Sequence, residues 1–238
     1  MFKIKLSQDS KKNIYSILPK ILIYIMMIYS VSNYYEFFKW YFSDNQKIIE
    51  EAFTLSLQSS IPMFIAIFLI HFFYYPKDIK DRANVISFPP IIFLFSMNLA
   101  FLISMSNMYY FQIYNIPEEL DILRSPSAGV ALIIIAFTIL SISIRQFNKV
   151  NEDPIPTSSS NLIINNNIYS YSRNPMYLAL LILQVGVGML LSIIHIILFT
   201  IFTFIVLKYY VIFPEERYLE NKFGDIYIQY KKTVRRWI

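Results

Sequence analysis

Long apolar runs separated by short polar stretches dominate the chain. Four of these runs contain the roughly 20 apolar residues that a helix needs to cross the hydrocarbon core of a bilayer. They cover about residues 16–37, 53–75, 88–110 and 127–147. A fifth run, about 177–213, is too long for one crossing, and Leu191-Ser192-Ile193-Ile194-His195 lies near its middle. We therefore expect a hairpin of two short helices there, which gives six spans in an all-α, polytopic membrane bundle.

Composition agrees with lipid as the solvent of this chain. Of its 238 residues 56% are hydrophobic and 18% aromatic, which lies outside the range of soluble globular domains. The absence of cysteine excludes disulfides, thiolate metal sites and a cysteine nucleophile. Only four glycines are present, and they form no glycine-rich loop for a nucleotide phosphate. A soluble nucleotide-binding fold is therefore not expected.

Lysine and arginine are concentrated in alternate connections between the predicted spans. Because cytoplasmic loops are enriched in both residues, this pattern predicts the orientation of the chain. One side carries only Lys39, Lys47 and Arg124. The other side carries sixteen: Lys3, Lys5, Lys11, Lys12, Lys77, Lys80, Arg82, Arg145, Lys149, Arg173, Arg217, Lys222, Lys231, Lys232, Arg235 and Arg236. We expect an integral protein of the plasma (inner) membrane with both termini cytoplasmic, since five spans would translocate the basic tail.

The basic residues also bear on the partners of the protein. They occur in short clusters between apolar runs, unlike the continuous basic surface of a nucleic-acid-binding protein, so we expect no nucleic-acid partner. The two histidines, His71 and His195, fall at predicted span ends, where an imidazole ring is readily accommodated, and we expect no metal site.

One polar connection, from Asn151 to Asn167, is rich in serine, asparagine and proline. Such composition is typical of a boundary between parts of a chain. It predicts a four-span membrane scaffold over residues 1–150. The remainder, 151–238, would carry the chemistry as a loop, a helical hairpin and a C-terminal cap.

The first candidate cluster leads directly into the fifth apolar run and contains Arg173, Asn174 and Pro175. Arginine and asparagine at a membrane boundary are costly to bury unless they are paired or bound to a polar ligand. Proline disfavours helix at the preceding residue and suits the first helical turn. We expect Arg173 and Asn174 just outside a helix N-terminus, where free amides favour an anion. An ordinary basic loop would satisfy the same pattern.

The second cluster begins with Pro214, Glu215 and Glu216 and continues to Gly224 and Asp225. Proline followed by acidic residues is favourable for a helix start, and Gly224 with Asp225 can end one helix and begin the next. Adjacent glutamates on a helix point about 100° apart. One could therefore accept hydrogen bonds from a ligand amine while the other pairs with Arg173 or Arg217.

The order and spacing of the two clusters resemble the C-terminal signature of the isoprenylcysteine carboxyl methyltransferase and phospholipid methyltransferase group. The resemblance covers roughly residues 160–238: the Arg-Asn-Pro-x-Tyr stretch, a short apolar hairpin, paired glutamates, Phe-Gly and two tyrosines. The closing Val234-Arg235-Arg236-Trp237-Ile238 is similar to the tail of bacterial members.

This resemblance implies a pocket for S-adenosylmethionine at the cytoplasmic membrane face, and a lipid or other lipophilic methyl acceptor. It implies catalytic roles for Arg173 and Glu216. It implies that the cofactor is bound by Tyr169, Arg173, Asn174, Pro175, Tyr177, Glu215 and Glu216. Tyr227 and Tyr230 are further candidates for closing the pocket, although interfacial aromatics would look the same.

Two departures from the family pattern bear on turn geometry and acceptor. Asn167 stands where the family usually has glycine, and asparagine tolerates positive φ better than most residues. Lys208 stands alone before the glutamates, where the eukaryotic prenylcysteine enzymes carry several arginines. The expected activity is therefore in-line methyl transfer to a lipophilic acceptor entering from the bilayer. The alternatives are an NADPH-dependent lipid or sterol reductase and a non-catalytic membrane protein.

Overall fold

The computed structural model describes residues 8–43, 49–76, 80–111 and 118–237, and within them the chain forms helices and connections but no strand. Five helices are long and apolar enough to span a membrane, so the predicted all-α membrane bundle is confirmed. They are α1 (Gln8–Tyr41), α2 (Ile49–Tyr74), α3 (Pro89–Tyr110), α4 (Pro126–Lys149) and a continuous helix over Ile194–Phe223.

The fifth apolar run forms the expected hairpin. Helix α5 (Pro175–Leu190) and helix α6 (Ile194–Leu207) are joined at Leu191 and Ser192, and Ser192 has a φ of 52°. The N–H of Ile193 donates to the carbonyl of Gly188 at 2.9 Å and closes the turn. With 16 residues, α5 is about 24 Å long at 1.5 Å per residue, shorter than the core of a typical bilayer. The count of six spans therefore stays a prediction.

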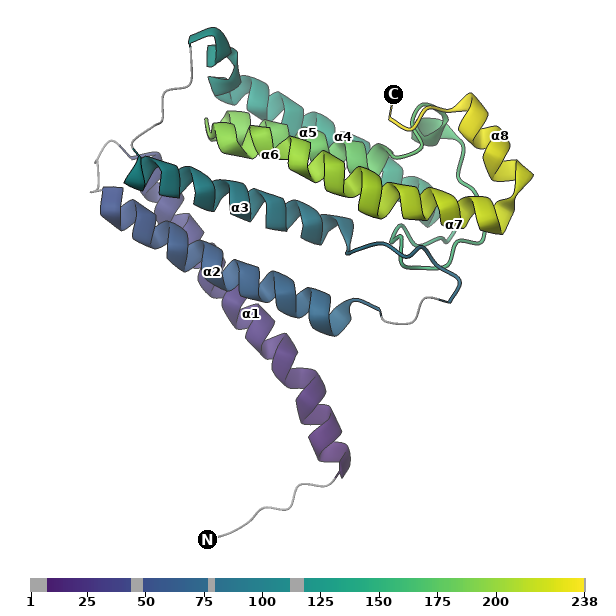
Figure 1. The fold of residues 1–238 in the computed structure, drawn as a ribbon, viewed down its shortest axis with the longest axis horizontal. Coiled ribbons are helices and arrows are strands. Elements are labelled where there is room, and N and C mark those ends of the chain that lie inside the picture. Colours follow the sequence, from purple (N-terminus) through teal and green to yellow (C-terminus); the bar gives the residue numbers. More distant parts are fainter. Residues whose placement is uncertain (1–7, 44–48, 77–79, 112–117, 238) are drawn as a thin grey trace.

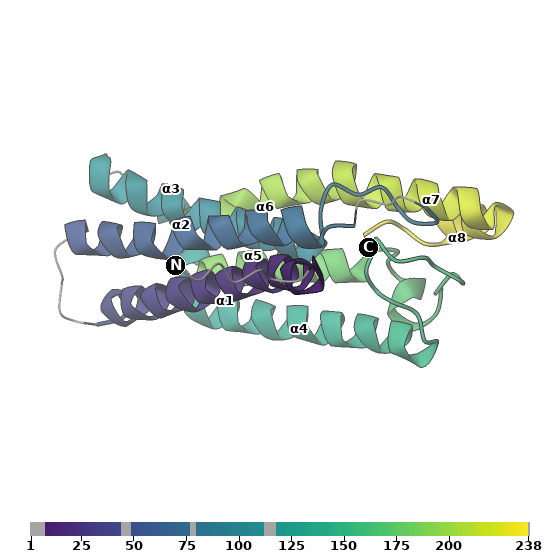
Figure 2. The same ribbon diagram turned by 90° about the horizontal axis from the view of Figure 1, so that it is seen from below.

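The helices run alternately in opposite directions, so the connections gather at two ends of the bundle (Figure 1). Helices α2 and α4 end, and α3 and α5 begin, at the end that also carries α7 (Phe213–Phe223), α8 (Asp225–Thr233) and the C-terminal tail. Figure 2 shows the same elements together at one end from below. We call this the cap end of the bundle.

The described basic residues follow this division. Arg82, Arg145 and Arg173 lie in elements of the cap end, whereas Lys39 and Arg124 lie at the other. Four of the basic residues counted for topology, Lys3, Lys5, Lys47 and Lys77, fall outside the described part of the chain, as does Ile238. Which side of the membrane each end faces stays a prediction.

A π-helical segment over Lys208–Ile212 joins α6 to α7. Pro214 lies in the first turn of α7, as its sequence pattern predicts, but the helical backbone is continuous from α6 through this segment. Proline has no N–H, which leaves the carbonyl of Tyr210, four residues earlier, without its helical partner. The N–H of Ile86, in the connection between α2 and α3, donates to that carbonyl at 3.0 Å. A distant segment thus supplies the hydrogen bond that Pro214 cannot.

Helices α4 and α5 approach each other closely at two glycines. A Cβ atom at Gly129 would meet the backbone nitrogen of Leu190 at 2.5 Å and the carbonyl oxygen of Gly186 at 2.7 Å. Both neighbours are backbone atoms, so neither can move aside as a flexible side chain could. Close approach at small residues is a common way for helices to pack in membranes.

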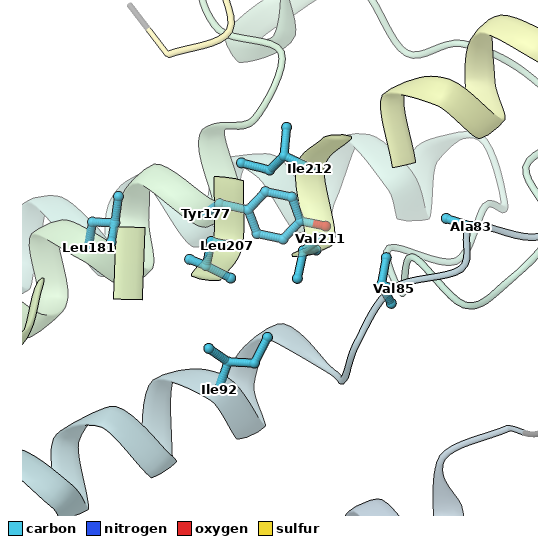
Figure 3. Packing of buried hydrophobic residues seen from close by; sticks show 8 residues of the cluster. All are labelled: Ala83, Val85, Ile92, Tyr177, Leu181, Leu207, Val211 and Ile212. Carbon is cyan, nitrogen blue, oxygen red and sulfur yellow. The ribbon is translucent and has the colours of Figure 1, made fainter. Parts of the chain in front are cut away.

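Buried side chains connect the hairpin to the first part of the chain. An apolar cluster at the cap end packs Ala83, Val85 and Ile92 against α5 and the α6–α7 helix (Figure 3). Deeper in the bundle, Thr203 Oγ1 donates to Gln184 Oε1 at 2.7 Å, and Gln184 Nε2 donates to Ser96 Oγ at 3.2 Å. These three fully buried polar residues link α3, α5 and α6.

Candidate functional site

A pocket opens at the cap end, among the N-terminus of α5, the first turns of α7, helix α8 and the polar connection that follows α4. It includes about 790 Å³ of space between the protein atoms, part of it continuous with solvent, so it is an open cleft. Every residue that the family resemblance implies for the site lines it: Tyr169, Arg173, Asn174, Pro175, Tyr177, Glu215 and Glu216. Tyr227 and Tyr230 line it as well.

The backbone before α5 follows the sequence prediction. Asn167 begins the short 3₁₀ helix η2 (Asn167–Ser170) with a φ of 54°, the positive value that asparagine was expected to tolerate. Asn174 has the non-helical φ and ψ of −131° and 51° and precedes α5, whose first residue is Pro175. Arg173 and Asn174 therefore lie on irregular backbone just outside a helix N-terminus, as predicted.

The guanidinium of Arg173 is bound entirely within the protein. Its Nε and Nη2 donate to Glu216 Oε1 at 3.2 and 2.9 Å. Its Nη1 donates to the backbone carbonyls of Lys231 and Val234 at the end of α8. The side chain is only 8% exposed, so these contacts replace the water that a buried cation has lost. Arg173 thus ties the N-terminus of α5 to the C-terminal tail.

Glu216 accepts hydrogen bonds on both carboxylate oxygens. Besides the two from Arg173, Arg236 Nε donates to Oε1 at 3.1 Å and Arg236 Nη2 donates to Oε2 at 2.7 Å. The hydrogen bond to Glu216 raises the pKa of Arg236. We call Arg173, Glu216 and Arg236 the buried ion triad. Of the two partners anticipated for a glutamate, Arg173 is present, whereas Arg217 is exposed and its place is taken by Arg236.

Glu215 is placed differently from its neighbour. It is half-buried, and its Oε2 accepts a hydrogen bond from the hydroxyl of Tyr177 at 2.7 Å. Within the part of the chain that the structure describes, Tyr177 is the one donor to this carboxylate. The glutamate pair is therefore divided: Glu216 is neutralised by two arginines, and Glu215 keeps acceptor capacity toward the pocket.

Three tyrosines form an aromatic wall of the pocket. Tyr230 donates from its hydroxyl to the carbonyl of Tyr169 at 2.7 Å, and its ring packs edge-on against Tyr227. Burial raises the pKa of Tyr169, Tyr227 and Tyr230, so all three phenols are neutral at physiological pH.

The hydroxyl of Tyr169 is a buried polar group without a partner. The side chain is 5% exposed, and within the described chain no group meets its hydroxyl at hydrogen-bonding geometry. Ser143 lies close enough to lower the pKa of Tyr169, and its own hydroxyl donates to the carbonyl of Ile139 at 2.7 Å. An unpartnered buried hydroxyl costs about 1–3 kcal/mol, and at the wall of a pocket this points to a ligand.

Two contributors to the site were not anticipated from the sequence. Arg236 was counted only among the basic residues that predict topology and in the C-terminal tail, and no local pattern indicates that it reaches Glu216. The connection after α4 was interpreted as a boundary between parts of the chain, yet residues 153–156, 160 and 162–164 form a wall of the pocket. The proline and isoleucine content of this connection could have indicated that it packs against the protein, because a purely solvated linker would not need those apolar side chains. The division of the chain at residue 150 itself stays a prediction.

The pocket offers groups suited to a cationic, partly aromatic ligand. Glu215 supplies a carboxylate whose pKa is raised by burial to about 7, so that a nearby cation would favour its charged form. Tyr169 supplies a hydroxyl, and tyrosine rings, which can attract cations, line the pocket. The residues needed to hold such a ligand come from η2, α5, α7 and α8, which are fastened together by the buried ion triad.

The fold and the pocket define a polytopic helical membrane protein with a polar pocket at one end of its bundle. Residues 125–226, from the start of α4 to the start of α8, match the family model described as phospholipid methyltransferase, and the chain belongs to this family of membrane methyltransferases. The chain is also similar to an uncharacterized protein from Haemophilus influenzae (strain ATCC 51907 / DSM 11121 / KW20 / Rd). The two are 40% identical over 67 residues, which cover 26% of this chain and 100% of that protein. No solved structure matches.

Proposed function

We propose that this protein transfers a methyl group from S-adenosylmethionine to a lipophilic acceptor at the cytoplasmic membrane face. The observation that carries the proposal is the pairing, in one pocket, of a carboxylate with spare acceptor capacity and a buried hydroxyl without a partner. Both residues, Glu215 and Tyr169, lie within the segment that matches the methyltransferase family. The basic character of the cap end supports its cytoplasmic placement in an inner membrane.

The residues around the pocket fit the methyl donor. Glu215 suits the ammonium of its amino-acid end, because a charge-assisted hydrogen bond is about twice as strong as a neutral one. The faces of Tyr169 and Tyr177 suit a positively charged sulfonium or a flat base. When bound, the donor supplies a methyl group on a positively charged sulfur. Tyr177 orients Glu215 through its hydroxyl, and the unpaired hydroxyl of Tyr169 gains the partner that it lacks.

Arg173 and Glu216 contribute by positioning. All four hydrogen bonds between Glu216 and its two arginines lie between 2.7 and 3.2 Å, so the carboxylate is held rather than free to move a proton. Both residues line the pocket, and direct contact of either with substrate stays a prediction. Their arrangement favours a role in fixing α7, and with it Glu215, against the N-terminus of α5.

In-line methyl transfer requires proximity, alignment and exclusion of water, and needs no covalent nucleophile. The apolar side chains of Phe147, Met176 and Leu219 line the pocket among the polar groups. An acceptor with an apolar body fits these neighbours and could reach them from the bilayer.

The direct test is binding of S-adenosylhomocysteine to the purified protein in detergent, measured by calorimetry. We expect binding by the wild type, and Glu215→Gln should weaken it about tenfold because a charge-assisted hydrogen bond is lost. Glu220→Gln is the matched control, because Glu220 pairs with Lys231 at 2.7 Å and lies outside the pocket lining. Absence of binding by the wild type would overturn the proposal.

The acceptor is found by a separate comparison. Lipid extracts from cells with and without the protein are compared by mass spectrometry for species that differ by one methylene. We expect a methylated lipid to be absent from cells that lack the protein and reduced in cells that carry the Glu215→Gln variant. Unchanged lipids would contradict a lipid acceptor.

A further inference from the structure

A polar cluster on the outside of the cap end joins three segments that are far apart in the sequence. Lys222 Nζ in α7 donates to Asp81 Oδ1 and Oδ2 at 2.7 and 2.8 Å, and to Ser159 Oγ at 2.9 Å. The hydroxyl of Ser159 in turn donates to Asp81 Oδ2. Tyr218 completes the group, donating from its hydroxyl to the carbonyl of Asp81 at 3.1 Å. We call these four residues the Asp81 cluster.

Asp81 is presented from a rigid base. Its side chain is 58% exposed, but Ala83 and Val85, which follow it, are 1% and 2% exposed and pack in the apolar cluster of Figure 3. The N–H of Ile86 is bound to the carbonyl of Tyr210 at 3.0 Å. The backbone of Asp81 has a φ of 50°, which most residues other than glycine avoid. An exposed side chain on such a fixed backbone can act as an anchor for the segments that bind it.

The segment that Asp81 anchors is a wall of the pocket. Ser159 belongs to the connection 151–166, whose residues 153–156, 160 and 162–164 line the pocket, and Ser160 donates its N–H to Tyr218 Oη at 3.2 Å. Within itself the connection is fastened by two acidic residues. Glu152 accepts from the backbone and side chain of Asn161 at 3.1 and 2.9 Å, and Asp153 accepts from the N–H of Ile155 and the hydroxyl of Ser158 at 3.0 and 2.6 Å. The Asp81 cluster therefore joins this connection to α7, beside the apolar cluster that Ile163 shares with Leu219 and Phe223.

Resting on the proposed function, we propose that Asp81 is a positioning residue for the methyl-donor pocket: by binding Lys222 and Ser159 it holds the 151–166 connection closed over the bound donor. Asp81 does not line the pocket and acts through its neighbours. Because the cluster is exposed, its hold is weak and sensitive to salt. The hydrogen bond from Lys222 lowers the pKa of Asp81, so the carboxylate stays ionised at neutral pH.

Hydrogen exchange and donor binding together test this role. In the variants Asp81→Asn and Lys222→Met we expect faster amide exchange confined to residues 151–166. We expect S-adenosylhomocysteine to bind about 2- to 5-fold more weakly, because the loss of an exposed ion pair has a small effect. Raising salt from about 0.05 M to about 0.5 M should weaken binding in the wild type and change it little in the variants. Lys222→Arg keeps the charge and the donors and should behave as the wild type.

The matched control is Asp121→Asn, which removes an exposed carboxylate paired with Arg124 at 3.6 Å at the opposite end of the bundle. It should change neither exchange in 151–166 nor binding. If Asp81→Asn and Lys222→Met leave both measurements at wild-type values, the positioning role is wrong. If the wild type binds no S-adenosylhomocysteine, the proposed function fails, while the exchange measurement still decides whether Asp81 holds the loop.

Discussion

Replacement of Glu216 by glutamine tests the buried ion triad. Glutamine keeps the size of the side chain but removes its charge, and it turns one acceptor oxygen into an amide that faces guanidinium donors. Arg173 is then left as a buried cation, with its side chain 8% exposed. Removal of one partner of a buried ion pair costs about 3–5 kcal/mol. Arg236 is 28% exposed and can be solvated by water when Glu216 is lost. We therefore expect a loss of stability at the lower end of this range, about 3 kcal/mol.

Thermal unfolding in detergent measures this loss. For a chain of this size, each kcal/mol lowers the unfolding temperature by about 2–4 °C, so Glu216→Gln should unfold about 6–12 °C below the wild type. The chain has two tryptophans, Trp40 in α1 and Trp237 beside Phe204 at the cap end. Two proteins that each keep only one tryptophan would report unfolding at the two ends of the bundle separately, by the fluorescence of that tryptophan. Glu216→Gln should lower the unfolding temperature more when it is measured at Trp237 than at Trp40.

The double variant Arg173→Met with Glu216→Leu provides the control. It removes the buried cation together with its partner, and apolar replacement of a buried ion pair is often neutral. We expect it to be more stable than Glu216→Gln alone. Unfolding of Glu216→Gln within about 1 °C of the wild type would refute the conclusion that the triad holds the cap together.

Three further predictions concern other parts of the molecule. Gly129→Leu should force α4 and α5 apart and destabilise the fold by about 1–3 kcal/mol in the same unfolding assay, whereas Ala131→Leu, at an exposed position of α4, should not. Gln184→Leu should cost about 1–2 kcal/mol, because the buried hydrogen bonds of its amide to Ser96, Thr203 and the carbonyl of Ile196 are lost; wild-type stability would show that this link contributes nothing. Tyr169→Phe should leave the unfolding temperature unchanged or higher but weaken S-adenosylhomocysteine binding about tenfold, and equal affinity would exclude its hydroxyl from the ligand contacts.

Much of the bundle could be predicted because lipid imposes a simple rule on the sequence. Apolar runs of sufficient length became α1 to α4, and the interruption around Ser192 became the hairpin turn. At the site, Asn167 and Asn174 adopted the expected backbone because asparagine and pre-proline residues have strong local preferences.

The features that escaped prediction depend on contacts between distant segments. Pro214 lies in the first turn of α7 as expected, but the helical backbone before it depends on Ile86, which lies 124 positions before Tyr210 and donates to the carbonyl that this proline leaves unpaired. Arg236 reaches Glu216 because the tail folds back along α8, which no pattern of neighbouring residues encodes. The pocket wall at 153–164 likewise depends on where a connection lies in space.

The hydrogen bond between Ile86 and Tyr210 also limits the insertions and deletions that this chain can tolerate in evolution. Surface connections usually tolerate insertions and deletions, because few atoms depend on their length. Here the α2–α3 connection is anchored on the helix one turn before Glu215, so a residue gained or lost between Asp81 and Ile86 would shift either that anchor or the Asp81 cluster. The length of this connection should therefore be as constrained as the identity of the residues that line the pocket.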